Sequence, residues 1–305
     1  MTFTQVLKGF IVSLTILVSS VVQADTIRIV VPFAPGGAAD QAARVVERAL
    51  TTHTQNTYVI EYRAGAGGAI GANYVAKSRG SDTILLIHSL AVVVNSLQAD
   101  SVYSLTEFEP VATLGTVQLA LITNPKSAVN TMPKLLATRD PVFFGSSGTG
   151  AATHIAGEVF GINTGVTMTH VPYRGEAAAL TDILGNNITV LFTGVGVAKD
   201  QPVTVLAVTG TRRSREFPQV PTLQEQGIRG FEVSPNWLVL LANSTADPRT
   251  LAVVRAAISR ALAEDPELFV RIGVDTDRQQ LYNTQQFMTT ERQRVQKILS
   301  RIQIK

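Results

Sequence analysis

The chain has 305 residues, with 26 Lys and Arg against 23 Asp and Glu, and it contains no cysteine. The lack of cysteine excludes a disulfide scaffold, thiolate metal sites and a cysteine nucleophile, so a chain of this length must be stabilised by its apolar core. Basic residues form no run and do not alternate with aromatic ones, which argues against nucleic acid as a partner.

Residues 1–24 have the pattern of a secretory signal peptide. Lys8 precedes an apolar run from Phe10 to Val18, and small residues end the segment at Ala24. The apolar run is shorter than the ~20 residues that a membrane-spanning helix needs. We therefore expect export, cleavage after Ala24, and a mature chain long enough for two packed domains.

The stretch from Ile29 to Leu50 is predicted to form a strand, a turn and a helix. A nearly continuous apolar run ends at Phe33, Pro35 and two glycines interrupt it, and apolar residues then recur at helical spacing. The first amides of such a helix are unpaired and its dipole is positive at the turn, which suits an anion. An ordinary strand-to-helix turn explains this stretch equally well. Asp40 is expected to satisfy amides of the first turn, because a carboxylate facing an anion would repel it.

The next segments continue the alternation of strands and helices. A glycine turn at 65–71 superficially suggests a dinucleotide site, but Ile70 occupies the position of the third glycine and no acid follows at the required distance. Close packing of a strand and a helix is the better explanation. The expected elements are a strand, a helix, a strand, a capped short helix and one or two strands, over residues 58–63, 72–77, 83–89, 104–108 and 111–124.

The segment from Pro141 to Phe160 repeats the first unit, with a strand, a turn of small residues and a helix. Two such turns facing each other across a cleft could hold one carboxylate from both sides, with hydroxyls of Ser146, Ser147 and Thr149 as extra donors. The glycines around Ser146 and Ser147 do not have the spacing of a hydrolase nucleophile elbow, and the four histidines lack metal-ligand spacing. The pattern therefore favours binding over catalysis.

The rest of the chain predicts a second α/β unit and terminal helices. A polar, proline-containing loop at 208–227 is expected to run into a short helix, and Asp-Pro pairs at 247–248 and 265–266 indicate helix starts. Further strands are expected at 168–173, 188–193, 203–209 and 231–241. The alternation throughout predicts α/β architecture with largely parallel sheets.

Five segments give the chain a resemblance to a known family. They read VPFAPGGAAD (31–40), YRAGAGGAIGA (62–72), GSSGTGAATHIAGEVF (145–160), HVPYRGEAAALTDILG (170–185) and LAVTGTRRSREFPQVPTLQEQG (206–227). Over nearly the whole mature chain, the sequence resembles the solute receptors of tripartite tricarboxylate transporters, called the Bug or TctC family. The resemblance implies a type II periplasmic-binding-protein fold, in which two Rossmann-like domains with crossing hinge strands close like a Venus flytrap. We expect domain 1 at 25–121 plus 234–305 and domain 2 at 122–233.

The resemblance also implies a function. It implies a periplasmic, monomeric receptor that binds a small organic acid without catalysis, cofactor or metal, and that works with integral-membrane transporter subunits. The two turns would hold one carboxylate, and Tyr173, Arg174 and Thr193 would shape the far end. The expected ligand-binding residues are Phe33, Pro35, Gly36, Gly37, Ala38, Ala39, Asp40, Ser89, Ser146, Ser147, Gly148, Thr149, Gly150, Ala151, Thr153, Tyr173, Arg174, Thr193 and Gly194.

Some features depart from the family or leave alternatives open. Thr193-Gly194 is uncharged where many members have Asp-Asn, so the sequence does not predict recognition of an ammonium group. The segment from Leu90 to Asn95 is more apolar than the polar turn expected there. Arg174 either pairs with a second carboxylate or extends into solvent. Two other functions stay open: a ligand-sensing receptor for a membrane sensor kinase, and an enzyme on the same fold, which the incomplete nucleophile elbow disfavours.

Overall fold

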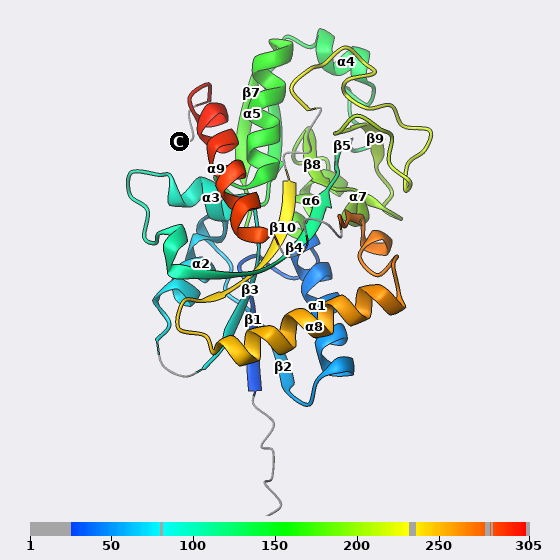
Figure 1. Ribbon diagram of the computed structural model, residues 1–305. Helices are drawn as coiled ribbons and strands as arrows, with labels where there is room; N and C mark the ends of the chain where they lie inside the picture. The colour runs from blue at the N-terminus through cyan, green and yellow to red at the C-terminus, as the bar shows by residue number, and fades with distance from the viewer. Residues whose placement is uncertain (1–25, 80–81, 232–235, 278–280, 282, 303–305) are drawn as a thin grey trace, which may run out of the picture.

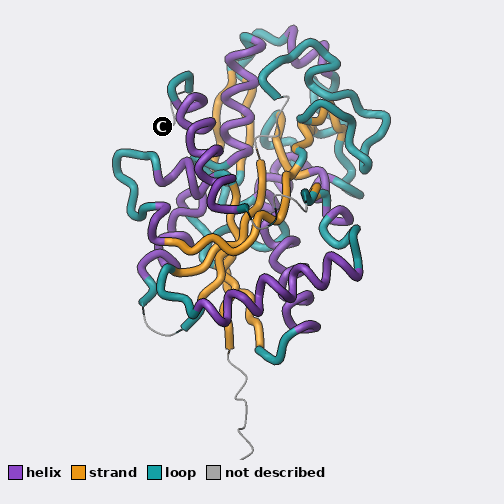
Figure 2. The backbone as a smooth tube through the Cα atoms, viewed as in Figure 1, coloured by secondary structure: helices purple, strands orange, loops and turns teal. Residues whose placement is uncertain are grey.

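The computed structural model describes residues 26–79, 82–231, 236–277, 281 and 283–302. The predicted signal peptide lies outside these residues. The described chain forms two sheets, one in each half of the molecule, with helices packed around them (Figures 1 and 2). Within the described residues, no helix combines the length and apolar content needed to cross a membrane.

The first sheet has six strands in the order β11-β4-β10-β3-β1-β2. β1 pairs in parallel with β2 and β3, while β10 runs antiparallel to both β3 and β4. The strands are β1 (Thr26–Val31), β2 (Thr57–Tyr62), β3 (Ile84–Ser89), β4 (Phe108–Val117), β10 (Asn236–Asn243) and β11 (Val274–Asp275). β3 is completely buried, and β1 is buried except at Thr26 and in part at Arg28, as the apolar runs predict.

The second sheet has five strands in the order β7-β6-β8-β5-β9. β6 pairs in parallel with β7 and β8, and β5 runs antiparallel to β8 and β9. The strands are β5 (Leu119–Thr123), β6 (Val142–Ser146), β7 (Met168–Pro172), β8 (Val190–Gly194) and β9 (Thr204–Val208).

The chain changes sheet between β4 and β5, which only Gln118 separates. The expectation of largely parallel sheets is wrong, because β5 and β10 run antiparallel to their neighbours. Each of them comes into its sheet from the other half of the molecule, and not from a helix that returns over the same sheet. The exact domain boundaries at 121/122 and 233/234 stay a prediction.

Helices cover both sheets (Figure 1). They are α1 (Ala38–His53), α2 (Ala69–Lys77), α3 (Ala91–Ser96), α4 (Met132–Ala137), α5 (Ala152–Thr164), α6 (Glu176–Leu184), α7 (Val195–Ala198), α8 (Pro248–Glu264) and α9 (Thr284–Leu299), with short 3-10 helices η1 (Ala66–Gly68), η2 (Leu105–Glu107) and η3 (Val270–Ile272). Asp247 caps α8 as expected, accepting from the amides of Arg249 and Thr250.

Two helix predictions are wrong. The Asp265-Pro266 pair starts no α-helix, and residues 223–227 form hydrogen-bonded turns. The segment after Leu90, which is more apolar than the polar turn expected there, forms α3 and buries Val92, Val93 and Val94 completely. Apolar burial therefore explains that departure from a polar turn.

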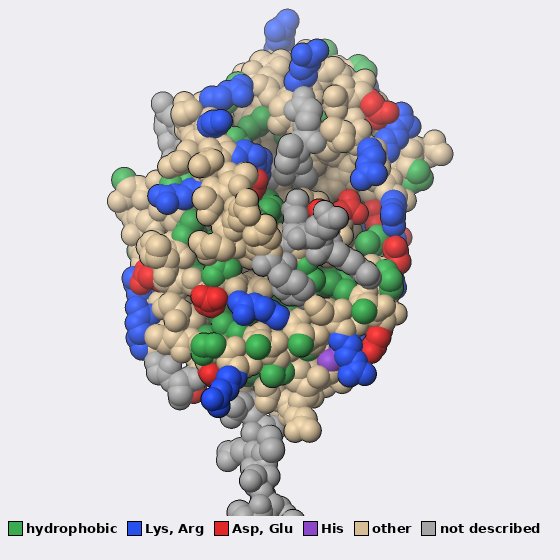
Figure 3. Space-filling view, in the orientation of Figure 1, with side chains coloured by type: hydrophobic (Ala, Val, Ile, Leu, Met, Phe, Trp, Pro, Cys, Tyr) green, Lys and Arg blue, Asp and Glu red, His purple; other side chains and the backbone are tan. Residues whose placement is uncertain are grey.

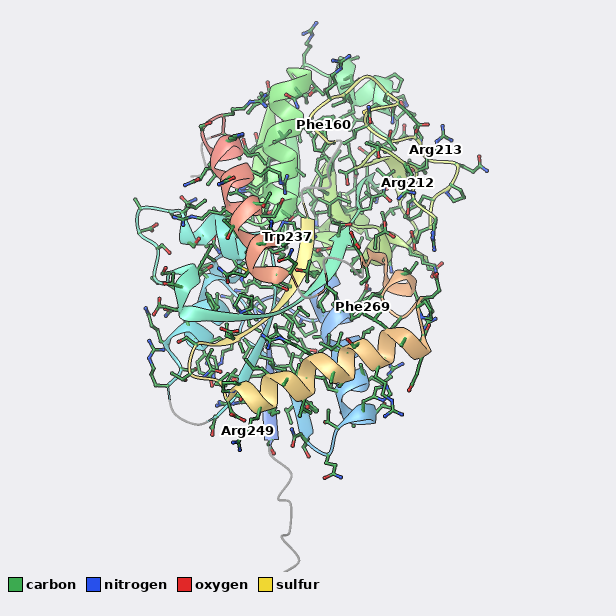
Figure 4. The ribbon with its side chains drawn as sticks, viewed as in Figure 1. Phe160, Arg212, Arg213, Trp237, Arg249 and Phe269 are labelled. Atoms are coloured by element: carbon green, nitrogen blue, oxygen red, sulfur yellow. The ribbon has the colours of Figure 1, made fainter. Side chains whose placement is uncertain are left out.

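Trp237 links the first sheet to the C-terminal helix α9. It lies on β10 near the middle of the molecule (Figure 4), its indole N–H donates to Glu291 of α9 at 2.6 Å, and its ring packs edge-on against Phe287. In the other half, Phe160 of α5 packs against Phe192 of β8 with ring centroids 6.1 Å apart. Each sheet thus has its own aromatic contact with the helices that cover it.

Candidate ligand-binding cleft

The turn before α1 is held by Asp40. Its carboxylate accepts from the amide of Gly36 at 2.8 Å and from the hydroxyl of Tyr62 at 2.7 Å, and it forms an ion pair with Arg44 at 3.1 Å. Gly37, the N-cap residue, provides no side-chain cap for the helix. The first amides of α1 are therefore available to groups from elsewhere in the molecule.

The turn before α5 is held by its own hydroxyl and imidazole groups. Thr153 accepts from the amide of Ser147 at 2.9 Å, and Nδ1 of His154 accepts from the amide of Gly150 at 3.1 Å. The hydroxyl of Ser146 accepts from the amide of Gly148 at 3.1 Å. The N-cap residue of α5, Ala151, has no side-chain cap hydrogen bond, so this helix also begins with amides that its own cap does not satisfy.

The two helix N-termini meet at a small cavity of about 20 Å³ between the two halves of the molecule. The predicted residues in its lining are Phe33, Gly37, Ala38, Ala39, Ser89, Ser147 and Thr153, and the residues that the sequence analysis missed are Ala152, Glu176, Asn236 and Leu238. The cavity thus brings together part of each predicted turn with the start of α6 and with β10.

Close backbone contacts shut the cleft on both sides of the cavity. On one side, the amide of Ala34 donates to the carbonyl of Arg174 at 2.9 Å. On the other, Gly67 lies against the backbone of Gly148 and Thr149, so closely that a side chain there would overlap the Thr149 carbonyl. These contacts hold the two halves together beside the cavity.

Several predicted ligand-binding residues lie outside the cavity lining. Ser146 is fully buried and bonds to Nε2 of His170 at 2.6 Å, and the hydroxyl of Tyr173 donates to Asp182. The side chain of Arg174 is exposed. Nine further predicted residues also lie outside the lining: Pro35, Gly36, Asp40, Gly148, Thr149, Gly150, Ala151, Thr193 and Gly194. Contacts of all these residues with a ligand stay a prediction.

Glu176 is the most informative residue that sequence reasoning missed. Its Oε2 accepts from the hydroxyl of Thr193 at 2.6 Å and from the amide of Gly194 at 2.9 Å, and its carboxylate also accepts from the amide of Ala38 in α1. Burial raises the pKa of Glu176, and these three donors oppose the shift. In the sequence it resembles any acid in the first turn of a helix. The signal that could have found it is its place after β7, at the sheet edge where the β6–α5 turn also lies.

His88 packs edge-on against Phe33, which lines the cavity, and the two ring centroids lie 5.6 Å apart. Burial lowers its pKa to about 3, and its Nδ1 accepts from the amide of Ser89 at 2.8 Å, so the ring is neutral at physiological pH. Among the described residues, no group of three His, Asp or Glu side chains could hold a metal ion.

A more open pocket lies apart from this cleft, near Gln118 where the chain changes sheet. Arg212 and Arg213 border it and extend from the loop after β9 toward the outside of the molecule (Figure 4). Arg213 pairs with Glu225 at 3.0 Å. On the face shown in Figure 3, basic side chains are spread over both halves and do not gather into one patch.

Comparison with known proteins identifies the family. The sequence matches the family described as "Tripartite tricarboxylate transporter family receptor" over residues 42–304. Protein BugT of Bordetella pertussis is 32% identical over 262 residues, which cover 80% of each chain. Among solved structures, "R. palustris Rpa4515 with adipate" has a TM-score of 0.83 at 26% identity, covering 91% of this chain and 97% of that one. The periplasmic binding protein BugD has a TM-score of 0.82 at 25% identity, over 90% and 96% of the two chains.

These similarities extend over almost the whole of each solved structure, so they confirm the expected two-domain fold of periplasmic binding proteins. They also agree with the crossing of the chain between the two sheets at Gln118. The chain belongs to the tripartite tricarboxylate transporter receptor family, the TctC or Bug family of periplasmic solute-binding proteins.

Proposed function

We propose that this protein is a periplasmic receptor that binds a small carboxylated metabolite between its two halves and delivers it to a tripartite tricarboxylate-type membrane transporter. The observation that carries the proposal is the meeting of two helix N-termini without side-chain caps, those of α1 and α5, at one cavity. The amide of Ala38 in α1 is paired with Glu176, so the other first-turn amides of the two helices, with the positive ends of the helix dipoles, are the groups that would stabilise a carboxylate. The relative Rpa4515, solved with the dicarboxylate adipate, supports this ligand class.

Closure of the cleft would allow the transporter to recognise the loaded receptor. The two halves touch on both sides of the cavity, at Ala34 with Arg174 and at Gly67 with Thr149. A ligand that contacts both halves binds the closed form more tightly and shifts the population toward it. A transporter that docks on the closed form would then distinguish loaded receptor from empty receptor.

The proposal includes no catalysis. The pair most like a nucleophile and a base is Ser146 with His170, 2.6 Å apart. Neither residue lines the cavity, and Ser146 has no exposed surface. Burial and the stacked ring of His154 lower the pKa of His170 to about 3, so the imidazole is a weak base near neutral pH.

Isothermal titration calorimetry tests the binding function. The mature protein, unfolded and refolded to remove any retained ligand, is titrated with mono-, di- and tricarboxylates and with amino acids. We expect at least one carboxylate to bind, and mass spectrometry of the recovered ligand to show it unchanged. If no carboxylate binds, the receptor proposal is wrong, and a chemically altered ligand would overturn the absence of catalysis.

A substitution in the cleft ties binding to this cavity. Gly37 has φ −86°, and a Cβ atom there would meet Glu176 at 3.6 Å, so a side chain fits the backbone but points into the contact between the two halves. Gly37→Phe should abolish binding, and Ala178→Phe at an exposed position of α6 should not. Uptake of the identified ligand by cells that lack the gene, complemented with wild type or Gly37→Phe, tests delivery.

A further inference from the structure

The buried carboxylate of Glu176 lies in the cleft that is proposed to bind an anion. Glu176 is 7% exposed and lines the cavity where the helices α1 and α5 begin. A carboxylate beside a ligand carboxylate disfavours binding, because two close negative charges repel each other in a site shielded from water. The nature of the ligand therefore depends on what balances this charge.

The contacts of Glu176 hold its carboxylate at the junction of the two halves. Two donors, the Thr193 hydroxyl and the Gly194 amide, come from β8, and the third, the Ala38 amide, comes from the first turn of α1. A carboxylate accepts about four hydrogen bonds. Three donors from the protein leave about one acceptor position, and the side chain borders the cavity, so that position is available to a ligand donor.

The charges around the cavity come from one carboxyl side chain and from the N-termini of three helices. Among the described residues, Glu176 is the one charged side chain in the lining. The N-terminus of each helix, α1 and α5, carries about half a positive charge. Two such helix ends offset about one negative charge, and the N-terminus of α6, in whose first turn Glu176 lies, adds about half a positive charge. A ligand with one carboxylate and no positive group would leave an excess negative charge, whereas a ligand with its own positive group would not.

We infer that Glu176 determines the ligand specificity of the cleft, and that the preferred ligand is an amino-bearing carboxylate whose ammonium group donates to Glu176. The inference rests on the proposed receptor function and names the ligand class within it. The ligand carboxylate lies at the start of α5, beside Ser147 and Thr153, and its ammonium group lies at the start of α6. The ion pair forms in a buried site, where charge-assisted hydrogen bonds are strong.

The inference changes the interpretation of Thr193 and Gly194. Taken alone, this uncharged pair argues against ammonium recognition. Both residues donate hydrogen bonds to Glu176, so they position a carboxylate that comes from a different segment of the chain. Glu176 therefore supplies the negative charge that the pair itself lacks.

Titration with matched ligand pairs tests the inference. The pairs differ only in an amino group: succinate and aspartate, butyrate and 2-aminobutyrate, adipate and 2-aminoadipate. We expect wild type to bind the amino-bearing member of at least one pair at least tenfold more tightly, and Glu176→Gln to lose at least tenfold in affinity for that member. Thr193→Val keeps the carboxylate but removes one donor, and we expect a smaller loss. Glu109→Gln, outside the cleft, is the matched control and should bind as wild type does.

The outcomes separate this inference from the proposed function. If wild type binds the plain carboxylates as tightly as their amino partners or more tightly, the inference is wrong and the receptor function stands. Proton uptake, measured in buffers of different ionisation enthalpy, would then show that a protonated Glu176 donates to the ligand. If neither member of any pair binds, nor any other carboxylate in the wider panel, the receptor proposal itself fails. The wild-type comparison decides the matter even if Glu176→Gln does not fold.

Discussion

Closure of the cleft should be sensitive to a single methyl group at Gly67. This glycine lies in η1 of the first half, and a Cβ atom there would stand 1.9 Å from the carbonyl oxygen of Thr149 in the second half. Ordinary van der Waals contacts begin at 3.4 Å. In Gly67→Ala, the two backbones must therefore move apart by about 1.5 Å (3.4 − 1.9) at this edge.

The size of the effect follows from the hydrogen bonds that such a shift disrupts. A ligand carboxylate held between α1 and α5 would lose good geometry with one of the two helices. A hydrogen bond to a charged group contributes about 1.5–3 kcal/mol, and about 1.4 kcal/mol corresponds to a tenfold change in affinity. We therefore expect Gly67→Ala to raise the dissociation constant roughly 10- to 100-fold.

Gly165 provides the matched control. Gly67 and Gly165 both have positive φ, +57° and +74°, but a Cβ atom at Gly165 meets nothing within 4 Å. Alanine costs about 1 kcal/mol of backbone strain at either position, so both variants should lose similar stability. Calorimetry gives the affinity, and small-angle X-ray scattering gives the ligand-induced decrease in radius of gyration. Equal affinity and equal compaction in the two variants would refute the reasoning.

Three further predictions concern stability. Burial lowers the pKa of His88 to about 3 in the folded state, against about 6.5 in the unfolded chain, so the unfolded state binds more protons between these values. The contribution of His88 to stability should be complete above about pH 6.5 and fall by up to about 1.4 kcal/mol per pH unit below it, and His170, whose pKa is also lowered to about 3, adds to the same slope. Urea unfolding at pH 7, 6 and 5 should show a slope that His88→Gln reduces but does not abolish. Glu291→Ala removes the acceptor of the Trp237 indole and should cost about 1–3 kcal/mol in urea unfolding, whereas an unchanged midpoint would contradict this. Asp247→Ala removes the cap of α8 and should cost about 1 kcal/mol, most of which Asp247→Asn should retain.

Most elements could be predicted because their signals are local. The apolar run of β1, the glycine turn and the helical spacing of α1 all lie within one short stretch. The direction of a strand is not local, because it depends on where the chain enters the sheet. The apolar residues of β5 predict a buried strand in either direction, and only its course from the first sheet makes it antiparallel to β8 and β9.

The residues of the candidate site also fall into those with a local signal in the sequence and those without one. Gly37 to Ala39 and Ser147 could be predicted because turns of small residues at helix starts are visible in the sequence. Asn236 and Leu238 could not, because β10 reaches the cavity only through its pairing with β3 and β4. Glu176 could not either, because its role depends on Ala38 and Thr193, which belong to segments far away in the chain.

The cleft is built mainly from backbone, and this shapes how its specificity can change. The amides that begin α1 and α5 are present whatever side chains follow them, and the contacts that shut the cleft involve backbone atoms of Ala34, Gly67 and Thr149. A substitution can therefore alter closure through a clash, but the backbone amides remain hydrogen-bond donors whatever side chain they carry. Glu176 is the acidic side chain in the lining of the same cavity, and one substitution removes it. Under the proposed function, selection among carboxylates could thus change at this position while the backbone amides at the helix starts are kept.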